Sequence, residues 1–277
     1  MPNINYYKNR IRNRIKILTL TEGLIVINVI MFLLTQLFNL VSGDGLLTLG
    51  AKVNALIGLG EYWRLFTAMF LHASIMHLIF NMMVLYILGR DIERFFGKKK
   101  FLLIYFLSGL VGSGASFLLV PGVSVGASGA IFGLMGANLF LYKLNPLVYK
   151  RLYGTDLLIL IGINLVLGFI TPNIDMAGHI GGLISGFVIA SALGLNVEKI
   201  WVKKRAPYQM LTVLLLVLPI VFGTLKIQSS EDLFVSGAYY YYTEGKINRS
   251  LDVIEKGLKK YPEQADLLYM KSILDKN

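Results

Sequence analysis

The sequence contains no cysteine among its 277 residues, and charged residues make up only 16% of the chain. The absence of cysteine excludes disulfides, thiolate metal sites and a cysteine nucleophile. The scarcity of charge argues against a soluble domain, because hydrophobic residues reach 55% and the mean hydropathy is +0.64. Residues 101–142 hold no charged residue, and this stretch is long enough for two bilayer crossings interrupted at Pro121-Gly122. We therefore expect an all-α polytopic membrane protein.

Apolar windows predict seven membrane-spanning helices. They lie at residues 23–40, 73–89, 101–120, 124–142, 157–172, 176–195 and 208–225, and the fifth is the weakest. The first window lacks the small-residue cleavage site of a signal peptide, so we expect it to be retained as a helix.

Lysine and arginine residues indicate the orientation of the chain in the bilayer. If the N-terminus is cytoplasmic, the cytoplasmic segments next to the helices hold 17 basic residues, whereas the outside loops before the last helix hold only Lys52 and Arg64. Because basic residues are retained on the cytoplasmic side, we expect a cytoplasmic N-terminus and an extracytoplasmic C-terminus. The same distribution explains the net charge of +11 without a nucleic-acid partner.

Composition divides the chain into four parts. Residues 1–20 form a basic cytoplasmic segment that we expect to contact anionic lipid, and residues 21–200 form a core of six transmembrane helices. A seventh transmembrane helix is expected within residues 201–227, and residues 228–277 have the composition of a small soluble helical segment.

The three histidines, His72, His77 and His179, all fall near the outer ends of predicted helices. Ser128 opens the fourth helix and His179 opens the sixth, so the two side chains are expected at one depth. Both helices carry small residues at four-residue spacing, which lets helix backbones approach closely. A serine needs a base to take its proton, and a neutral imidazole suits that task. The pair is therefore a candidate catalytic dyad, with Ser128 as nucleophile and His179 as general base.

Other residues have the chemistry to support this dyad. No Asp or Glu lies inside the fourth or sixth helix, so packing or a backbone group must orient the imidazole, and Phe132 is placed to stack on it. His77 and Asn81 share one helix face and can donate to an oxyanion beside the Ser128 amide.

Plainer interpretations exist for each of these residues. A serine in an apolar helix often bonds to the carbonyl four residues earlier, a buried Asn or His often bridges helices, and small-residue ridges often serve packing alone. A proton-relaying transporter needs polar groups through the bilayer, whereas residues 184–192 are nearly all apolar or small. His72 and His77 are five residues apart, which is the wrong spacing for a helical zinc protease, so we expect no metal and no cofactor.

Taken together, these motifs resemble those of the rhomboid intramembrane proteases over about residues 20–200. The matching segments are Trp63-Arg64, His77-x-x-x-Asn81, Gly126-x-Ser128-Gly129 and His179-x-Gly181-Gly182 followed by Gly186. The sequence departs from the family in having Phe132 where Tyr is frequent and Gly178 where Ala is usual. Neither departure removes a catalytic group.

The resemblance implies a six-helix core with a Ser-His dyad in a water-filled cavity open to the outside. It implies substrates that are single-span membrane proteins, cleaved near the outer membrane boundary, and a location in a bacterial plasma membrane. His77, Asn81 and the Ser128 amide would form the oxyanion hole, and Trp63-Arg64 would anchor the first loop. The seventh helix fits the six-plus-one type of the family. The alternative is a non-catalytic rhomboid-like protein that binds membrane clients, although such a protein would be expected to lack Ser128 or His179.

The C-terminal segment resembles one tetratricopeptide repeat. Residues at repeat-like positions are Phe234, Ala238, Tyr241, Gly245, Ile254, Gly257 and Pro262. Ser250 departs from the pattern, which usually has a small Ala there. Because one repeat cannot bury both its faces, we expect it to pack on a partner protein, a second copy or the membrane core. The alternative is a helical hairpin without a recognition role.

Overall fold

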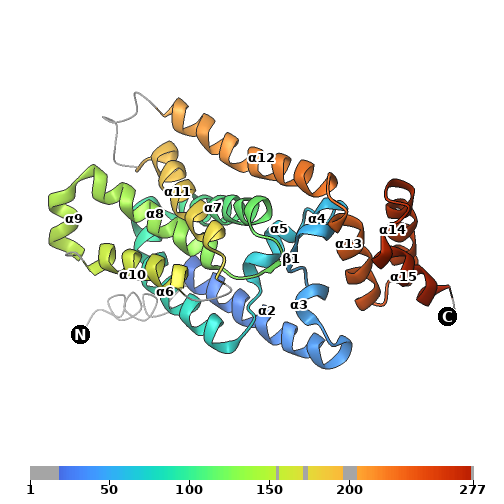
Figure 1. Cartoon of the computed structure of the whole chain (residues 1–277). Coiled ribbons are helices and arrows are strands. Elements are labelled where there is room, and N and C mark those ends of the chain that lie inside the picture. Colours follow the sequence, from blue (N-terminus) through green and yellow to red (C-terminus); the bar gives the residue numbers. More distant parts are fainter. Residues whose placement is uncertain (1–18, 154–155, 171–173, 196–204, 276–277) are drawn as a thin grey trace.

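The structure is a computed structural model, and it describes residues 19–153, 156–170, 174–195 and 205–275. Long helices form a bundle in which α7, α8 and α11 pack together at the centre (Figure 1). The helices that match the predicted spans are α2 (Leu20–Ser42), α6 (Ile75–Phe96), α7 (Lys98–Leu119), α8 (Ser128–Leu144), α10 (Asp156–Ile170), α11 (Met176–Leu193) and α12 (Ala206–Gln228). The basic N-terminal residues and Lys199, Lys203 and Lys204 lie outside the described residues.

The all-α polytopic membrane fold expected from the sequence is confirmed. Within the described residues, α2, α6, α7, α11 and α12 are long and apolar enough to cross a membrane. Helix α8 has 17 residues and α10 has 15, so they are shorter. A further short helix, α9 (Pro146–Tyr153), connects these two.

Two predicted boundaries were wrong. Helix α6 continues past residue 89 to Phe96, because the apolar window ends at Arg90 while the charged segment that follows remains helical. Helix α8 begins at Ser128 rather than at residue 124, because Val123-Ser124 form strand β2. This strand pairs antiparallel with β1 (Lys52–Val53) from the first loop, in the register Lys52 to Ser124.

Glycines allow α8 and α11 to touch backbone to backbone. A methyl group on Gly182 would collide with the backbone of Gly129, and one on Gly186 would collide with the backbone of Gly133. Such close approach replaces side-chain packing with direct contact between the two helices. It also places the first turn of α11 beside the first turn of α8.

The loop between α2 and α6 folds into a compact unit between the end of α2 and the start of α6. It contains α3 (Gly45–Thr48), α4 (Asn54–Gly58), α5 (Arg64–Thr67) and a 3-10 turn, η1 (Ala68–Phe70). Arg64 lies at its centre with only 1% of its surface exposed. Its guanidinium donates to the carbonyl oxygens of Leu47 and Ala51 at 2.9 and 3.1 Å. Arg64 thereby fixes the course of the loop, whereas the neighbouring Trp63 is half exposed.

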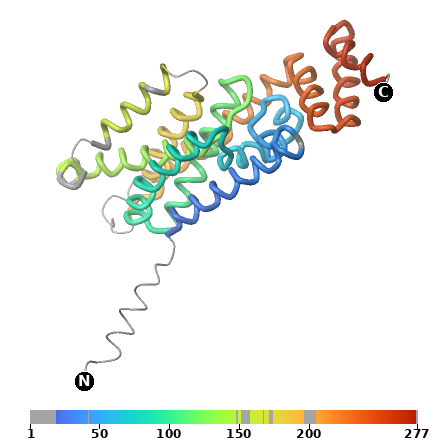
Figure 2. Tube along the Cα trace, turned by 90° about the horizontal axis from the view of Figure 1, so that it is seen from below, coloured from blue at the N-terminus to red at the C-terminus, as the bar shows by residue number. Residues whose placement is uncertain are grey.

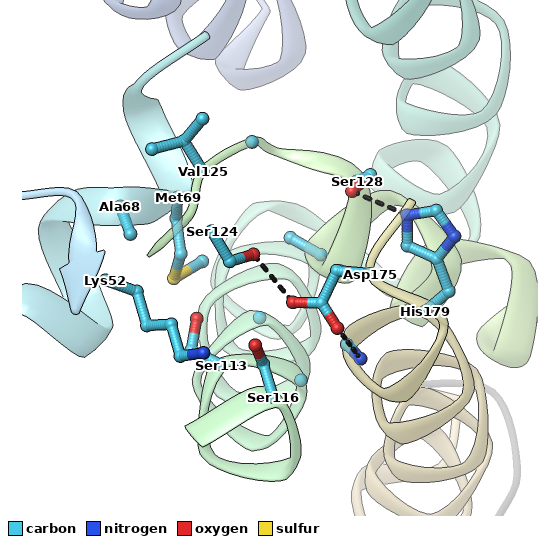
Figure 3. A pocket seen from close by; sticks show the side chains of 16 residues that line it. Lys52, Ala68, Met69, Ser113, Ser116, Ser124, Val125, Ser128, Asp175 and His179 are labelled. Carbon is cyan, nitrogen blue, oxygen red and sulfur yellow. Dashed lines mark hydrogen bonds between the residues drawn. The ribbon is translucent and has the colours of Figure 1, made fainter. Parts of the chain in front are cut away.

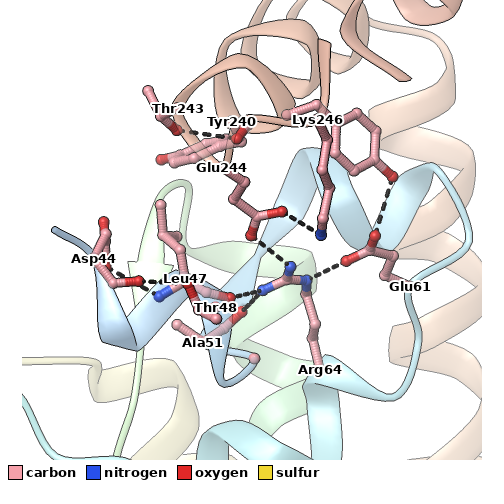
Figure 4. A network of polar contacts seen from close by, with 12 residues as sticks. Asp44, Leu47, Thr48, Ala51, Glu61, Arg64, Tyr240, Thr243, Glu244 and Lys246 are labelled. Carbon is pink, nitrogen blue, oxygen red and sulfur yellow. Dashed lines mark hydrogen bonds and ion pairs between the residues drawn. The ribbon is translucent and has the colours of Figure 1, made fainter. Parts of the chain in front are cut away.

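The C-terminal segment packs on this first loop. Its helices are α13 (Asp232–Thr243), α14 (Ile247–Lys260) and α15 (Ala265–Leu274), grouped at one end of the bundle (Figure 2). Arg64 also contacts Glu61 at 2.6 Å and Glu244, just after α13, at 3.3 Å (Figure 4). The Tyr241 hydroxyl donates to Glu61 at 3.1 Å. A buried ionic network therefore joins the segment to the first loop.

Replacing Glu244 with Gln is expected to destabilise the protein by about 1–3 kcal/mol, because a buried charged hydrogen bond to Arg64 is weakened. Glu61 and two carbonyl oxygens remain as partners of Arg64, which limits the loss. The matched control is Asp252→Asn, which breaks an exposed ion pair with Lys256 and is expected to change stability by less than about 0.5 kcal/mol. Thermal unfolding in detergent compares the two. Equal shifts in both variants would contradict a stabilising role for the buried network.

Candidate active site

Ser128 and His179 meet at the ends of the two helices that pack most closely. Ser128 is the first residue of α8, and His179 lies in the first turn of α11. The Oγ of Ser128 lies 2.8 Å from Nε2 of His179, within hydrogen-bond distance (Figure 3). The geometry therefore suits transfer of the hydroxyl proton to the imidazole.

The imidazole of His179 is held by an aromatic ring. Phe132, one turn after Ser128 on α8, stacks on it with ring centroids 4.3 Å apart and planes inclined by 16°. The Nδ1 atom of His179 is buried, and no described residue lies within hydrogen-bond distance of it. Packing against Phe132, rather than a carboxylate on Nδ1, orients the ring in the described part of the chain.

His77 lies beside the loop that precedes Ser128, and Asn81 lies one turn further along α6. A methyl group on Gly126 would lie 2.9 Å from Nε2 of His77, so the imidazole lies against the backbone just before Ser128. Gly126 has a φ of +136°, which only glycine adopts readily, and this conformation permits the approach. The Nδ2 atom of Asn81 donates to the His77 carbonyl at 3.0 Å. A second N–H of that amide remains as a possible donor.

A cleft opens next to the serine, and several of the side chains that line it are polar (Figure 3). The empty space in and in front of it is about 380 Å³, which includes open solvent. Beside Ser128 and His179, its lining includes Lys52, Ser113, Ser116, Ser124 and Asp175. Water can therefore be held next to the dyad by polar groups.

Lys52 is a buried cation in this cleft, with 1% of its surface exposed. Its ammonium donates to the carbonyl oxygens of Val120 and Gly122 at 2.8 and 3.2 Å. Burial lowers the pKa of Lys52 from its ordinary value of 10.5 to about 8, and the nearby Asp175 carboxylate partly opposes that shift. The folded state therefore loses the lysine proton at lower pH than the unfolded state does.

Stability is expected to rise with pH between about 8 and 10.5 because of Lys52. Below this pH window Lys52 is protonated in both the folded and the unfolded state, and the folded state is destabilised by the full cost of burying the ammonium. Within it the unfolded chain binds more protons than the folded chain, which favours folding as pH increases. The measurement is the unfolding temperature across this range for the parent and for Lys52→Met. A slope that is the same in both proteins would contradict the assignment.

Sequence reasoning overlooked several residues of this cleft. From the sequence, Lys52 is recognised only as a cation outside the membrane, Asp175 is not singled out, and Ser124 falls inside the predicted span 124–142. A signal for Asp175 existed, because an Asp directly before an apolar helix is a typical N-cap. No comparable local signal marks Lys52 or Ser124, since their positions depend on the pairing of β1 with β2.

Comparison with known proteins agrees with the motifs. Residues 59–196 match the family described as Rhomboid domain. The chain is 38% identical to rhomboid protease GluP of Bacillus subtilis over 258 residues, which cover 93% of this chain and 51% of that protein. It is 38% identical to putative rhomboid protease YdcA of the same organism over 133 residues, covering 47% of this chain and 67% of that protein. It is 44% identical to RHOMBOID-like protein 6, mitochondrial, of Arabidopsis thaliana over 148 residues, which cover 52% of this chain and 48% of that protein. The chain thus spans about half the length of GluP and of the Arabidopsis protein, and two thirds of YdcA.

Proposed function

The chain belongs to the rhomboid family, and we propose that it is an intramembrane serine endopeptidase that cleaves single-span membrane proteins with Ser128 and His179. The observation that carries the proposal is the 2.8 Å contact between Ser128 Oγ and His179 Nε2. The stacked Phe132 and the polar cleft support it, because they hold the base and admit water.

In the proposed mechanism, Ser128 Oγ attacks the carbonyl carbon of the scissile bond while His179 Nε2 takes the hydroxyl proton. The resulting oxyanion would accept hydrogen bonds from the Ser128 amide and from the His77 and Asn81 side chains. The imidazolium then gives its proton to the leaving amine as the C–N bond breaks. Water, deprotonated by His179, hydrolyses the acyl ester and restores the serine. During the imidazolium stage the face of Phe132 can stabilise the positive ring, since aromatic faces attract cations.

The position of the dyad at one end of the bundle supports cleavage near one membrane face. The starts of α6, α8 and α11, which carry His77, Ser128 and His179, lie at the same end of the bundle as the first loop. Lys226 near the end of α12 bonds to the Leu118 carbonyl at that end too. We propose that this face is extracytoplasmic, with the N-terminus in the cytoplasm of a bacterial cell, as the distribution of basic residues favours.

The test is to map the products from a single-span reporter incubated with the purified protein in liposomes. We expect one main cut near the extracytoplasmic end of the reporter helix. Faster cleavage is expected when Gly or Pro lies beside the cut, because the substrate helix must unwind there. Binding of the reporter without any cut would favour the client-binding alternative. A cut at the cytoplasmic end would contradict the proposed orientation.

For the C-terminal segment we propose a tetratricopeptide-like unit that binds a partner protein. Phe234, Ala238, Tyr241 and Ile254, all at repeat-like positions, pack in one hydrophobic cluster. Ser250 is fully buried, and its hydroxyl donates to the Ala238 carbonyl at 2.8 Å, which explains how the polar residue is accommodated.

The partner is tested with a photo-crosslinking residue at Tyr269, which is 68% exposed on α15. A defined adduct in native membranes, absent when the crosslinker replaces the exposed Lys256 on α14, would support the proposal. The same crosslinked adducts at both positions would contradict the proposal and favour a helical hairpin without a recognition role.

A further inference from the structure

A second hydrogen bond runs beside the contact between Ser128 and His179. The Ser124 hydroxyl donates to Oδ2 of Asp175 at 2.6 Å (Figure 3). Both pairs join residues 51 positions apart, so Ser124 and Asp175 each precede a member of the dyad by four residues. The same two chain segments are therefore tied together twice.

On the histidine side, Asp175 is bound directly to the start of α11. Its Oδ1 accepts from the Gly178 amide at 2.9 Å, which makes Asp175 the N-cap of this helix. Its backbone carbonyl accepts from the His179 amide at 3.1 Å. A displacement of Asp175 therefore moves the first turn of α11, and the imidazole with it.

On the serine side, the loop before α8 is held in place by the first loop. Ser124 pairs with Lys52 across β1 and β2, and the Gly126 amide donates to the Ala68 carbonyl at 2.9 Å. The ammonium of Lys52 binds two carbonyl oxygens at the beginning of the same segment. These contacts hold Ser124 in place, and Ser124 in turn helps to position the loop that carries Ser128.

Charge adds to this connection. The Lys52 ammonium and the Asp175 carboxylate line the same cleft and attract each other. No other Lys, Arg, Asp or Glu is among the residues that line it. The attraction draws the carboxylate toward the loop that carries Ser124.

We infer that Ser124 and Asp175 are positioning residues, whose hydrogen bond sets the separation between the loop bearing Ser128 and the helix bearing His179. The inference rests on the proposed protease function. Neither side chain has a described hydrogen bond to the Ser128 hydroxyl or to the imidazole. The hydrogen bond between them acts on the reaction through the backbone of the two segments, and the Asp175 charge also interacts with His179 directly.

The first variant is Ser124→Ala, which removes the donor without changing the cap on α11. It is expected to lower kcat by about 10- to 100-fold, because small displacements of reacting groups reduce rates by such factors. KM and the unfolding temperature are expected to stay unchanged. Ser124→Thr, which keeps the hydroxyl, is expected to restore kcat.

The second variant is Asp175→Ser, which retains a good N-cap but is too short to reach Ser124. Its kcat is expected to fall as in Ser124→Ala, and the double variant is expected to be no slower than the slower single one. This non-additivity is the signature of one shared interaction. Ser191→Ala is the matched control, because that hydroxyl bonds to the Phe187 carbonyl in its own helix and is not part of the cleft lining.

The inference is overturned if Ser124→Ala keeps the parental kcat, or if its loss of kcat comes with an equal loss of thermal stability. It is also overturned if Ser191→Ala slows the reaction as much, or if the effects of the two variants multiply. An inactive parent would instead count against the proposed function, and so the two failures can be distinguished.

Discussion

Ser128→Ala is expected to reduce cleavage of a single-span reporter by at least about 10⁴-fold, with the protein still folded. The side chain lost is one hydroxyl group, and its only described hydrogen-bonding contact is with His179. No other described hydroxyl in the cleft is hydrogen-bonded to the imidazole, so the described residues offer no substitute nucleophile. The measurement is the initial rate of product formation, with thermal unfolding as the check on folding.

His179→Ala is expected to cause a loss of similar size, because a serine without its base is a poor nucleophile. The double variant is expected to be no slower than either single variant, since the two residues act as one unit. Ser191→Ala serves as the control, because that hydroxyl only bonds to the Phe187 carbonyl in its own helix. Substantial cleavage by Ser128→Ala, or losses that multiply in the double variant, would contradict the dyad.

The second large effect is expected from Gly186→Ala. The added methyl group meets the backbone of Gly133 on α8, which cannot rotate away as a side chain can. The helices must move apart, and we expect a destabilisation of about 3 kcal/mol or more, at or above the upper end of ordinary overpacking. The dyad lies at the ends of these same helices, so a shift near 1 Å is expected to reduce cleavage about 100-fold.

Gly162→Ala on α10 is the matched control for this prediction. Apart from its chain neighbours and the backbone of its own helix, no described atom lies within 4 Å of the position where its methyl group would be. In an exposed helix interior, Ala is favoured over Gly by up to about 1 kcal/mol, so this variant is expected to be neutral or slightly more stable. Unfolding temperatures and cleavage rates of both variants decide the question. Parental stability in Gly186→Ala would show that α8 and α11 do not pack as described.

The number and order of the membrane-spanning helices could be predicted from the sequence, because each of them contains a long run of apolar residues. Windows of apolar residues find the lipid-facing part of a helix, and all seven predicted spans correspond to helices. The windows do not find helix ends, because the charged turn of α6 beyond Arg90 remains helical outside the apolar run. Likewise, Val123 and Ser124 extend an apolar run, and only pairing with the first loop makes them a strand.

The candidate dyad was identifiable because Ser128 and His179 stand at helix starts beside regularly spaced glycines. Contacts between distant segments were not predictable in this way. Arg64 and Glu244 are 180 residues apart, and nothing near Glu244 marks it as buried rather than solvated. The bond between Ser124 and Asp175 likewise depends on the closeness of α8 and α11, which local patterns indicate only in general terms.

The most direct test of the account is covalent labelling of the purified protein with a fluorophosphonate, followed by mass spectrometry of its peptides. Such a reagent reacts with a serine hydroxyl that is activated by a base. We expect one adduct, on Ser128, in the parent protein, and none under the same conditions in folded His179→Ala. An adduct on another serine, or equal labelling of Ser128 in both proteins, would contradict the claim that His179 activates Ser128.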